Sequence, residues 1–405
     1  MAVGYEGLPE LYPVEGLRLG TTKAGIRKPN RRDLVIFELT GGSRAAAVFT
    51  TNRFQAAPVQ VARQHLASAA PRYLVINTGY ANAGTGSEGL KAAQETCAAL
   101  AQLAGCDTEQ VLPFSTGVIG EPLPVERLVA GMPAALEALS ATGWAEAAEG
   151  IMTTDTLPKG ASRRVVIDGQ SCTLTGISKG AGMIRPNMAT MLGFIATDAA
   201  VSQDLLQQAV AQAARASFNR ITVDGDTSTN DACVVVATGA HPTLTIDVSR
   251  AAFDAFVAAL TEVCTELAQL IVRDGEGASR FVSVEVEGGR DEAECEAVAY
   301  AVAESPLVKT ALFAGDPNWG RILAAVGRAG ITDLDVEGVQ LFIDDLCIAE
   351  RGGRAADYSE EAAAERMAKN ELSIRILLGR GKAQATVWTC DLSYDYVRIN
   401  ADYRT

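Results

Sequence analysis

Histidine is nearly absent from this chain of 405 residues, which contains only His65 and His241. A metal site built on several histidines is therefore excluded. A Ser-His-Asp triad would have to recruit one of these two side chains, although a packing or surface role is the usual one for an isolated histidine. If the chain is an enzyme that forms a covalent intermediate, we expect its base to be a group other than histidine.

Several other features are missing as well. No uninterrupted apolar run reaches the length of about 18–20 residues that a membrane-spanning helix needs. The N-terminal stretch MAVGYEGLPELYPVEG lacks the basic and apolar blocks of a signal peptide. The eight cysteines form no CxxC pair, so we interpret them as small buried side chains in a reducing compartment. These absences predict a cytoplasmic protein with no membrane partner.

Positive charge is also in short supply, because 35 Lys and Arg face 49 Asp and Glu, for a net charge of −14. The short basic segment IRKPNRRD at 26–33 is interpreted as a solvated loop rather than a phosphate-binding segment. We expect no nucleic-acid partner on electrostatic grounds. A Walker-type phosphate loop is absent, and Arg185 replaces the third glycine that a GxGxxG motif beginning at Gly180 would need. The acidic loop at 223–231 lacks the glutamate that completes an EF-hand, so we expect no metal ion.

Short apolar, β-branched runs alternate with segments of helical periodicity along the whole chain. Many of the strands are close enough to form hairpins. This favours a mixed α/β or α+β layered sandwich over a doubly wound parallel sheet, in one unit without an internal linker. The helix pattern over 88–104 has Ser87 as its candidate N-cap and Gly105 beyond its end. Strands are predicted over 33–39, 73–77, 164–167, 194–197, 281–286, 339–343, 372–378 and 383–389, and helices over 88–104, 203–218, 251–272 and 359–369.

The most informative segment is SKGAGMIRPNMATMLGF at 178–194. Its turn-forming residues lead directly into an apolar strand, and the pair Ala189-Thr190 lies at the junction. The ordinary interpretation is that a β-branched threonine starts a strand. If the Ala189–Thr190 bond is cleaved, however, Thr190 gains a free α-amine with a pKa of about 7.7–8.0, which suits a general base. One residue would then supply both nucleophile and base.

Glycine-rich polar loops follow several apolar strands, which is where scaffolds usually carry functional groups. In one of them Thr116 offers a hydroxyl and Gly117 an unobstructed N–H, as an oxyanion site requires, although an ordinary turn has the same composition. Lys179 could hold a substrate carboxylate. Glu276, between two glycines, could meet an ammonium group or could be a solvated acid.

Taken together, ten segments in register resemble the ornithine acetyltransferase family of arginine biosynthesis, the glutamate N-acetyltransferases. The resemblance covers essentially the whole chain. Tyr80 stands where the family has an asparagine, and Gln55 where cysteine is common. The matching segments are KAGI (23–26), VFTTNRFQAAPV (48–59), NTGYANAGTG (77–86), STGVIG (115–120), TTDT (153–156), KGAGMIRPNMATMLGF (179–194), DGDTSTND (224–231), VRDGEGASRF (272–281), GDPNWGR (315–321) and VRINADYRT (397–405).

The resemblance implies a layered α/β sandwich like that of N-terminal-nucleophile hydrolases. It further implies self-cleavage between Ala189 and Thr190 into an α chain (1–189) and a β chain (190–405). The two chains are expected to stay together as one catalytic unit and to assemble as an α2β2 heterotetramer.

The implied chemistry is ping-pong transfer of an acetyl group from N2-acetyl-L-ornithine to L-glutamate through acetyl-Thr190. Acetyl-CoA is expected as a co-substrate for a second activity, the synthesis of N-acetylglutamate, and no cofactor or metal is implied. Thr116 and Gly117 match the oxyanion-hole pair of the family. The implied substrate contacts are Thr153, Lys179, Thr190, Glu276, Asn400 and Thr405.

Two alternatives stay open at this level. The chain could be a self-processing aminopeptidase of the same fold, or a non-catalytic regulator that binds an amino acid. The second alternative predicts an intact chain of 405 residues.

Overall fold

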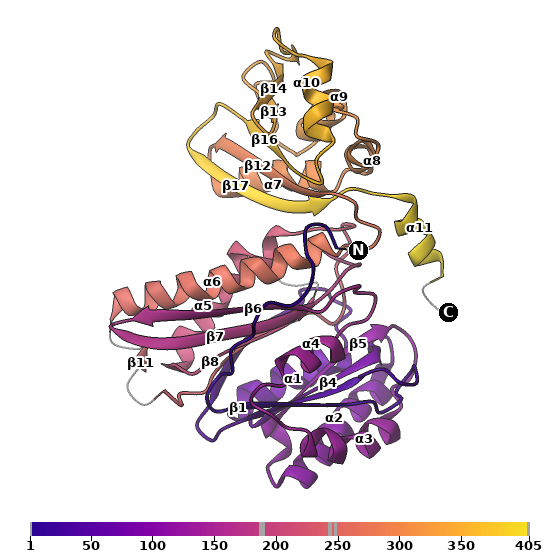
Figure 1. Ribbon diagram of the computed structural model, residues 1–405, viewed down its shortest axis with the longest axis vertical. Helices are drawn as coiled ribbons and strands as arrows, with labels where there is room; N and C mark the ends of the chain where they lie inside the picture. The colour runs from indigo at the N-terminus through magenta and orange to yellow at the C-terminus, as the bar shows by residue number, and fades with distance from the viewer. Residues whose placement is uncertain (1, 186–190, 242–244, 247–248, 403–405) are drawn as a thin grey trace.

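Three larger sheets and the helices that cover them make up the computed structural model, which describes residues 2–185, 191–241, 245–246 and 249–402. The first two sheets lie face to face, and helices cover the outer face of each, so that four layers are stacked (Figure 1). The third sheet forms a separate body with helices of its own. The predicted layered α/β fold is therefore confirmed.

The first sheet has the strand order β1-β2-β4-β5, in which only β4 and β5 run parallel. Helices α2 and α3 cover its outer face, and α1 packs against the edge strand β5. The short 3₁₀ turn η1 (Thr108–Gln110) precedes β5. The strands are β1 (Leu17–Thr22), β2 (Leu34–Leu39), β4 (Tyr73–Tyr80) and β5 (Val111–Val118), and the helices are α1 (Ala57–Ser68), α2 (Gly86–Ala104) and α3 (Val125–Glu137).

The second sheet has the order β3-β10-β8-β7-β6. Its central strands β8 and β10 run parallel to each other and are buried along their whole length, as strands covered on both faces must be. Helices α5 and α6 cover the outer face. The elements are β3 (Arg44–Phe49), β6 (Lys159–Ile167), β7 (Gln170–Lys179), β8 (Leu192–Thr197), β10 (Ala232–Ala237), α5 (Gln203–Ala216), α6 (Arg250–Arg273), the 3₁₀ turn η2 (Phe218–Arg220) and a small parallel pair of β9 (Ala200–Val201) and β11 (Thr245–Ile246).

Aromatic rings fill the space between these two sheets. The ring centroid of Phe194 lies 5.4 Å from that of Phe37 and 5.1 Å from that of Phe114. Trp144, on helix α4 (Trp144–Gly150), closes one side with its centroid 6.0 Å from Phe37. One buried aromatic cluster therefore joins β2, β5 and β8, which fixes the position of β8 against the first sheet.

Helix α6 is the one described helix that is long and apolar enough, by length and composition alone, to cross a membrane. Of its most apolar window, 56% is buried inside the protein. Its apolar side chains pack on β6, β7 and α5, which accounts for the hydropathy of the helix.

The third sheet, of order β15-β14-β13-β16-β12-β17, has a hydrophobic core of its own. The seven residues 274–280 connect α6 to it, and α11 (Tyr394–Ala401) leads back toward the first body (Figure 1). The boundary is therefore a tight loop, which explains why the sequence shows no polar linker. The elements are β12 (Phe281–Gly289), β13 (Gln340–Ile343), β14 (Leu346–Glu350), β15 (Gly353–Arg354), β16 (Glu371–Leu377), β17 (Ala383–Cys390), α7 (Glu292–Ala303), α8 (Pro306–Ala314), α9 (Trp319–Gly327) and α10 (Glu360–Met367).

The predicted strands and helices are found where the periodicity placed them, with one local error. Ser87 is not the N-cap of α2, because the helix starts at Gly86 and its cap position is Thr85. Thr85 donates its hydroxyl to Asn82 instead of accepting from the helix. The other end is as expected, since Gly105 adopts the left-handed conformation (φ 68°) that terminates helices.

Replacement of Phe194 by alanine tests the aromatic cluster between the sheets. Phe194 is 1% exposed, so Phe194→Ala should lower the free energy of unfolding by about 3–5 kcal/mol through lost burial and the remaining cavity. Thermal denaturation checks this. Val166→Ala, at a position 71% exposed, is the control and should leave the melting temperature nearly unchanged. Equal melting temperatures for the two variants would contradict the proposed packing.

Candidate functional site

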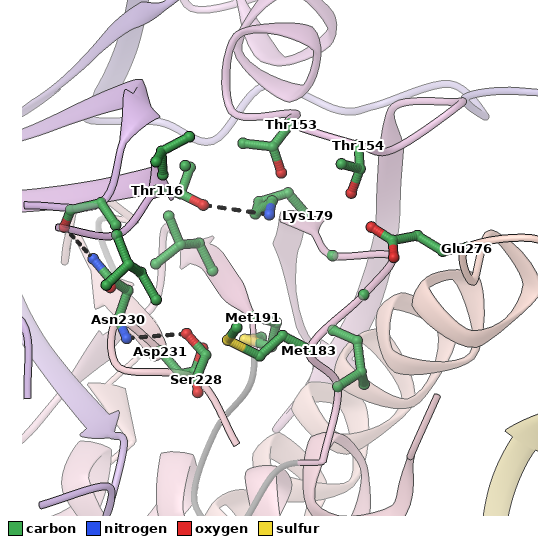
Figure 2. Close-up of a pocket in the computed structure, with 18 of the residues that line it drawn as sticks. Thr116, Thr153, Thr154, Lys179, Met183, Met191, Ser228, Asn230, Asp231 and Glu276 are labelled. Carbon is green, nitrogen blue, oxygen red and sulfur yellow. Dashed lines mark hydrogen bonds between the residues drawn. The ribbon is translucent and has the colours of Figure 1, made fainter. Parts of the chain in front are cut away.

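A pocket of about 240 Å³ lies where loops of the first two sheets meet the loop after α6. Figure 2 shows Thr116 and Lys179 pointing toward each other, with Thr153 and Glu276 on the same cavity. Six residues that the sequence motifs singled out line this pocket, from segments far apart in the chain: Thr116, Gly117, Thr153, Lys179, Glu276 and Asn400.

Three of the predicted site residues, Ala189, Thr190 and Thr405, lie outside the described residues. The described chain on both sides of the predicted cleavage bond nevertheless lines the pocket, through Met183 and Ile184 before it and Met191 and Leu192 after it.

Hydrogen bonds of their backbone groups anchor both of these flanks, one to Asp224 and the other to the first residue of β10. Asp224 accepts from the N–H of Met183 (2.6 Å) and Ile184 (2.9 Å). After the gap, the carbonyl of Met191 accepts from the N–H of Ala232 at 3.0 Å. The chain entering and the chain leaving 186–190 are therefore both held at the pocket.

The oxyanion candidates Thr116 and Gly117 lie at the end of β5, where the pairing with β4 shifts register at Gly79/Tyr80. Gly117 has φ +130°, and a Cβ added to it would come within 2.3 Å of the Gly79 carbonyl carbon. Only glycine satisfies both the dihedral angle and the close backbone approach. The irregular end of the strand pair thus leaves the Gly117 backbone at the pocket wall.

Asn230 was not predicted as a site residue, although it lies in the DGDTSTND segment that carries part of the resemblance. Its side-chain amide donates to the carbonyls of Ala81 (2.6 Å) and Ser115 (2.9 Å), and its oxygen accepts from the Thr229 hydroxyl (2.7 Å). Asn230 therefore joins its own loop to the segment after β4 and to strand β5. The sequence shows a polar loop beside an apolar strand at this position, but it does not show which residues accept hydrogen bonds from Asn230.

Lys179 lies at the end of β7, and its Nζ donates to the Thr116 hydroxyl at 3.3 Å. Burial lowers the pKa of this ammonium below its ordinary value; the carboxylates of Asp155, Asp231 and Glu276 oppose that shift. Lys179 is thus a desolvated cation at the wall of the pocket, where a carboxylate ligand would compensate its charge.

Beneath the pocket lies a second buried cation, Lys159, whose side chain is 0% exposed. Its Nζ is 2.6 Å from a carboxylate oxygen of Asp155 and 2.6 Å from one of Asp274, and these two side chains are 0% and 1% exposed. We call Asp155, Lys159 and Asp274 the buried ion triad. Its two ion pairs offset the cost of burying three charges.

The buried ion triad holds three parts of the site wall. Asp155 accepts from the N–H of Thr153 (2.9 Å) and from the N–H of Gly180 (2.7 Å), next to Lys179. Asp274 lies two residues before Glu276 and accepts from the N–H of Thr156 (2.9 Å). Asp155 and Lys159 cannot be identified as site residues from the sequence, because their ion pairs form only in the folded chain.

Glu276 is held on the opposite side of the pocket from Thr116. Its N–H donates to the Ala181 carbonyl (2.8 Å), and its carboxylate accepts from the Asn400 side chain on α11 (2.7 Å). Gly182 permits this position, since a Cβ there would come within 2.4 Å of the Glu276 carboxyl carbon. Glu276 is 8% exposed, so it is a buried carboxylate at the pocket and not the solvated loop acid that the sequence also allowed.

No histidine lines this pocket in the described part of the chain. His65 is buried on α1 and its Nδ1 bonds to the Val111 carbonyl at 2.8 Å, so it has the packing role expected of it. The eight cysteines are all free, and six of them are buried. The polar groups that line the pocket instead include the Lys179 ammonium, the carboxylates of Asp231 and Glu276, and several hydroxyls, so the pocket can pair with both a negative and a positive charge of a ligand.

Comparison with known proteins gives concordant results along the whole chain. The ArgJ family matches residues 18–405. The chain is 59% identical over 407 residues to the arginine biosynthesis bifunctional protein ArgJ of Pseudomonas syringae pv. tomato, and 58% identical over 410 residues to that of Pseudomonas fluorescens, with 100% of each chain covered. Among solved structures, the arginine biosynthesis bifunctional protein argJ of Bacillus halodurans is 40% identical with a TM-score of 0.50, covering 52% of this chain and 99% of that chain.

Substitution of Asp155 tests the buried ion triad. Burial alone would raise the pKa of this carboxyl, but Lys159 and Lys179 outweigh burial and hold it well below its ordinary value. A depressed carboxyl pKa contributes stability above the unfolded-state value of about 3.9, and that contribution is lost as the pH falls below it. Asp155→Asn should therefore cost about 3–5 kcal/mol near neutral pH and weaken the acid dependence of stability.

Thermal denaturation of wild type and variant between about pH 3 and pH 7 provides the measurement. Asp254→Asn is the matched control, because that carboxylate forms an i,i+4 pair at 56% side-chain exposure and should matter little. Parallel stability curves for wild type and Asp155→Asn would contradict the assignment.

Proposed function

The chain belongs to the ArgJ family, and on that premise we propose that it transfers an acetyl group from N2-acetyl-L-ornithine to L-glutamate through a covalent acetyl-Thr190 intermediate. The observation that carries the proposal is one pocket lined by the candidate oxyanion, carboxylate and ammonium partners and by both flanks of residues 186–190. The second proposed activity is acetylation of glutamate with acetyl-CoA as donor. Relatives that share the whole length of the chain are bifunctional proteins of arginine biosynthesis, which supports an enzyme with two activities.

Cleavage of the Ala189–Thr190 bond is the proposed first event, giving chains 1–189 and 190–405. Support comes from the solved Bacillus halodurans chain, 99% of which corresponds to only 52% of this one, as expected for a polypeptide of about half the length. The strand order of the second sheet favours continued association of the two chains after cleavage. Its order β3-β10-β8-β7-β6 places β8 and β10, which follow the cleavage site, between strands that precede it.

In the proposed transfer, the α-amine of Thr190 takes the proton of the Thr190 hydroxyl, and Oγ attacks the acetyl carbonyl of N2-acetyl-L-ornithine. The Thr116 hydroxyl and the Gly117 N–H stabilise the oxyanion, which is worth about 3–4 kcal/mol per donor in comparable sites. The nitrogen of ornithine takes the proton and leaves. The amine of L-glutamate then attacks the acetyl ester and regenerates Thr190.

Substrate recognition is assigned to the opposite charges across the pocket. Lys179 is proposed to bind the substrate carboxylate and Glu276 the ammonium group of the ornithine side chain. Thr153 and Asn400 would contribute hydrogen bonds, and Thr405 completes the proposed set by family resemblance. An α2β2 assembly in the cytoplasm, free of cofactor and metal, belongs to the same proposal.

Thr190→Ala separates this proposal from its alternatives. Without the hydroxyl the variant should neither cleave nor transfer, and intact-mass spectrometry should show a single chain of 405 residues, whereas wild type gives two fragments that meet at Ala189/Thr190. Thr190→Ser should retain part of both activities, because a hydroxyl survives. Full acetyl transfer by Thr190→Ala would rule out the mechanism. Intact wild type would favour a non-catalytic regulator, and peptide hydrolysis in excess of transfer would favour an aminopeptidase.

Glu276→Gln tests the charge assignment within the pocket. Ornithine carries a side-chain ammonium and glutamate does not, so the variant should raise KM for N2-acetyl-L-ornithine by about tenfold or more and change KM for L-glutamate much less. Steady-state kinetics with each substrate varied in turn gives both constants. Glu95→Gln, at an exposed position on α2, is the control and should leave both unchanged. An equal rise in the two constants would show that Glu276 acts on the site as a whole.

A further inference from the structure

A second cavity of about 240 Å³ adjoins the candidate active site and shares part of its wall. The two cavities have Gly117, Val118, Thr153 and Thr154 in common. Gly117 is a candidate oxyanion donor, so a molecule lying in the second cavity could extend past it to the reacting centre. The proposed transfer from N2-acetyl-L-ornithine does not use this cavity.

The second cavity differs from the first in the charge of its wall. Arg27, Lys28 and Arg31 line it, from the basic segment that the sequence indicated to be a solvated loop. That interpretation is only partly right, since Lys28 is exposed but Arg27 and Arg31 are half-buried. We call this cavity the cationic side pocket. In a chain with a net charge of −14, three cations at one cavity wall are a local concentration of positive charge.

The carboxylate of Asp33 shapes this basic loop from within. One of its oxygens accepts from the N–H of Ala24 (2.7 Å) and the other from the N–H of Ile26 (2.6 Å). A second acid, Asp402, lies at the edge of the cavity on the α11 side. Cations therefore outnumber acids on the wall by three to two, and one of the two acids is engaged by the backbone of its own loop.

The two arginines are oriented by neighbouring groups. Arg31 donates from one nitrogen to the carbonyls of Met152 (2.6 Å) and Thr153 (3.1 Å), which are neutral. Arg27 pairs with Glu121 at 2.7 Å, and its guanidinium carbon lies 5.3 Å from the centroid of the Tyr80 ring. Tyr80 is one of the two positions where this chain departs from the family pattern, and here its ring contacts a cation of the side pocket.

Neither Lys28 nor Arg31 forms a salt bridge to a carboxylate within the described ranges of the chain. Both charges are thus available to a ligand at the mouth of the cavity. Guanidinium and ammonium groups together are the usual partners of phosphate oxygens. An amino acid is the poorer fit, because the adjoining pocket already matches both of its charges with Lys179 and Glu276.

We propose that the cationic side pocket binds the phosphate-bearing part of an acyl-thioester donor, so that its acyl group extends past Gly117 into the active site. The inference rests on the proposed acetyl-Thr190 function and assigns a place to its second acetyl donor. In the step it serves, the Thr190 oxygen forms a bond to the acetyl carbon and the carbon–sulfur bond breaks. The hydroxyl proton passes to the Thr190 α-amine and from there to the departing sulfur, which leaves as a thiol.

Reversal of one charge, Lys28→Glu, tests this in the full-length enzyme. Three donors are compared with L-glutamate as acceptor: acetyl-CoA, S-acetyl-N-acetylcysteamine, which is a thioester without phosphate, and N2-acetyl-L-ornithine. The variant should raise KM for acetyl-CoA by about fivefold to thirtyfold and leave KM for the other two donors unchanged. Higher salt should raise the wild-type KM for acetyl-CoA and have a smaller effect in the variant. Lys91→Glu, on the exposed side of α2, is the charge-matched control and should behave as wild type.

Two results would overturn the inference while leaving the ornithine reaction in place. One is a wild-type enzyme that uses N2-acetyl-L-ornithine but not acetyl-CoA. The other is a KM for acetyl-CoA that Lys28→Glu leaves unchanged, or shifts only as much as it shifts KM for the phosphate-free thioester. Absence of acetyl transfer from all three donors in wild type would instead refute the proposed function itself.

Discussion

The buried ammonium of Lys159 is the constraint on which the geometry of the site depends. A charge with no exposure to water must have carboxylate partners, and Asp155 and Asp274 supply them from different segments. Each partner also binds backbone N–H groups of a loop at the pocket, so the need to neutralise Lys159 fixes where those loops lie. The position of Lys179 beside Thr116 follows from it, since Gly180 is held directly by Asp155. The need to neutralise the buried Lys159 ammonium therefore fixes the positions of the loops that line the pocket.

The family and the layered α/β fold could be predicted from the sequence, because motif order and strand periodicity are local properties. The match to residues 18–405 and the stacked sheets confirm both. Asp155 and Asn230 could not be predicted as site residues, because their roles depend on hydrogen bonds to residues that are distant in the sequence. The separate core of the third sheet escaped for a related reason: its boundary is a tight loop without the composition of a linker. The catalytic and cleavage roles of Thr190 stay predictions.

The sequence of a charged segment does not show which way each of its side chains points in the folded protein. The basic segment at 26–33 has the composition of a solvated loop, and a linear reading cannot tell which of its cations face water and which face a cavity. In the folded protein, the Asp33 carboxylate shapes this loop by accepting hydrogen bonds from the N–H groups of Ala24 and Ile26. The result is two adjoining cavities with different electrostatic character, one with opposite charges on facing walls and one with an excess of cations. Under the proposed function, this division provides a separate recognition site for each of two donors of unlike chemistry.

The strand order of the second sheet has a consequence for the maturation of the enzyme. This sheet contains strands from before and after residues 186–190, with β8 and β10 lying together between β3 and β7. Neither half can complete this sheet alone, and the loops that line the pocket are in place only when the halves have paired. A chain that cuts itself with this pocket must therefore fold before it is cut. In the proposed maturation, the Ala189–Thr190 bond is a tether that makes the pairing of the halves intramolecular, and a cleaved molecule is one that has already folded.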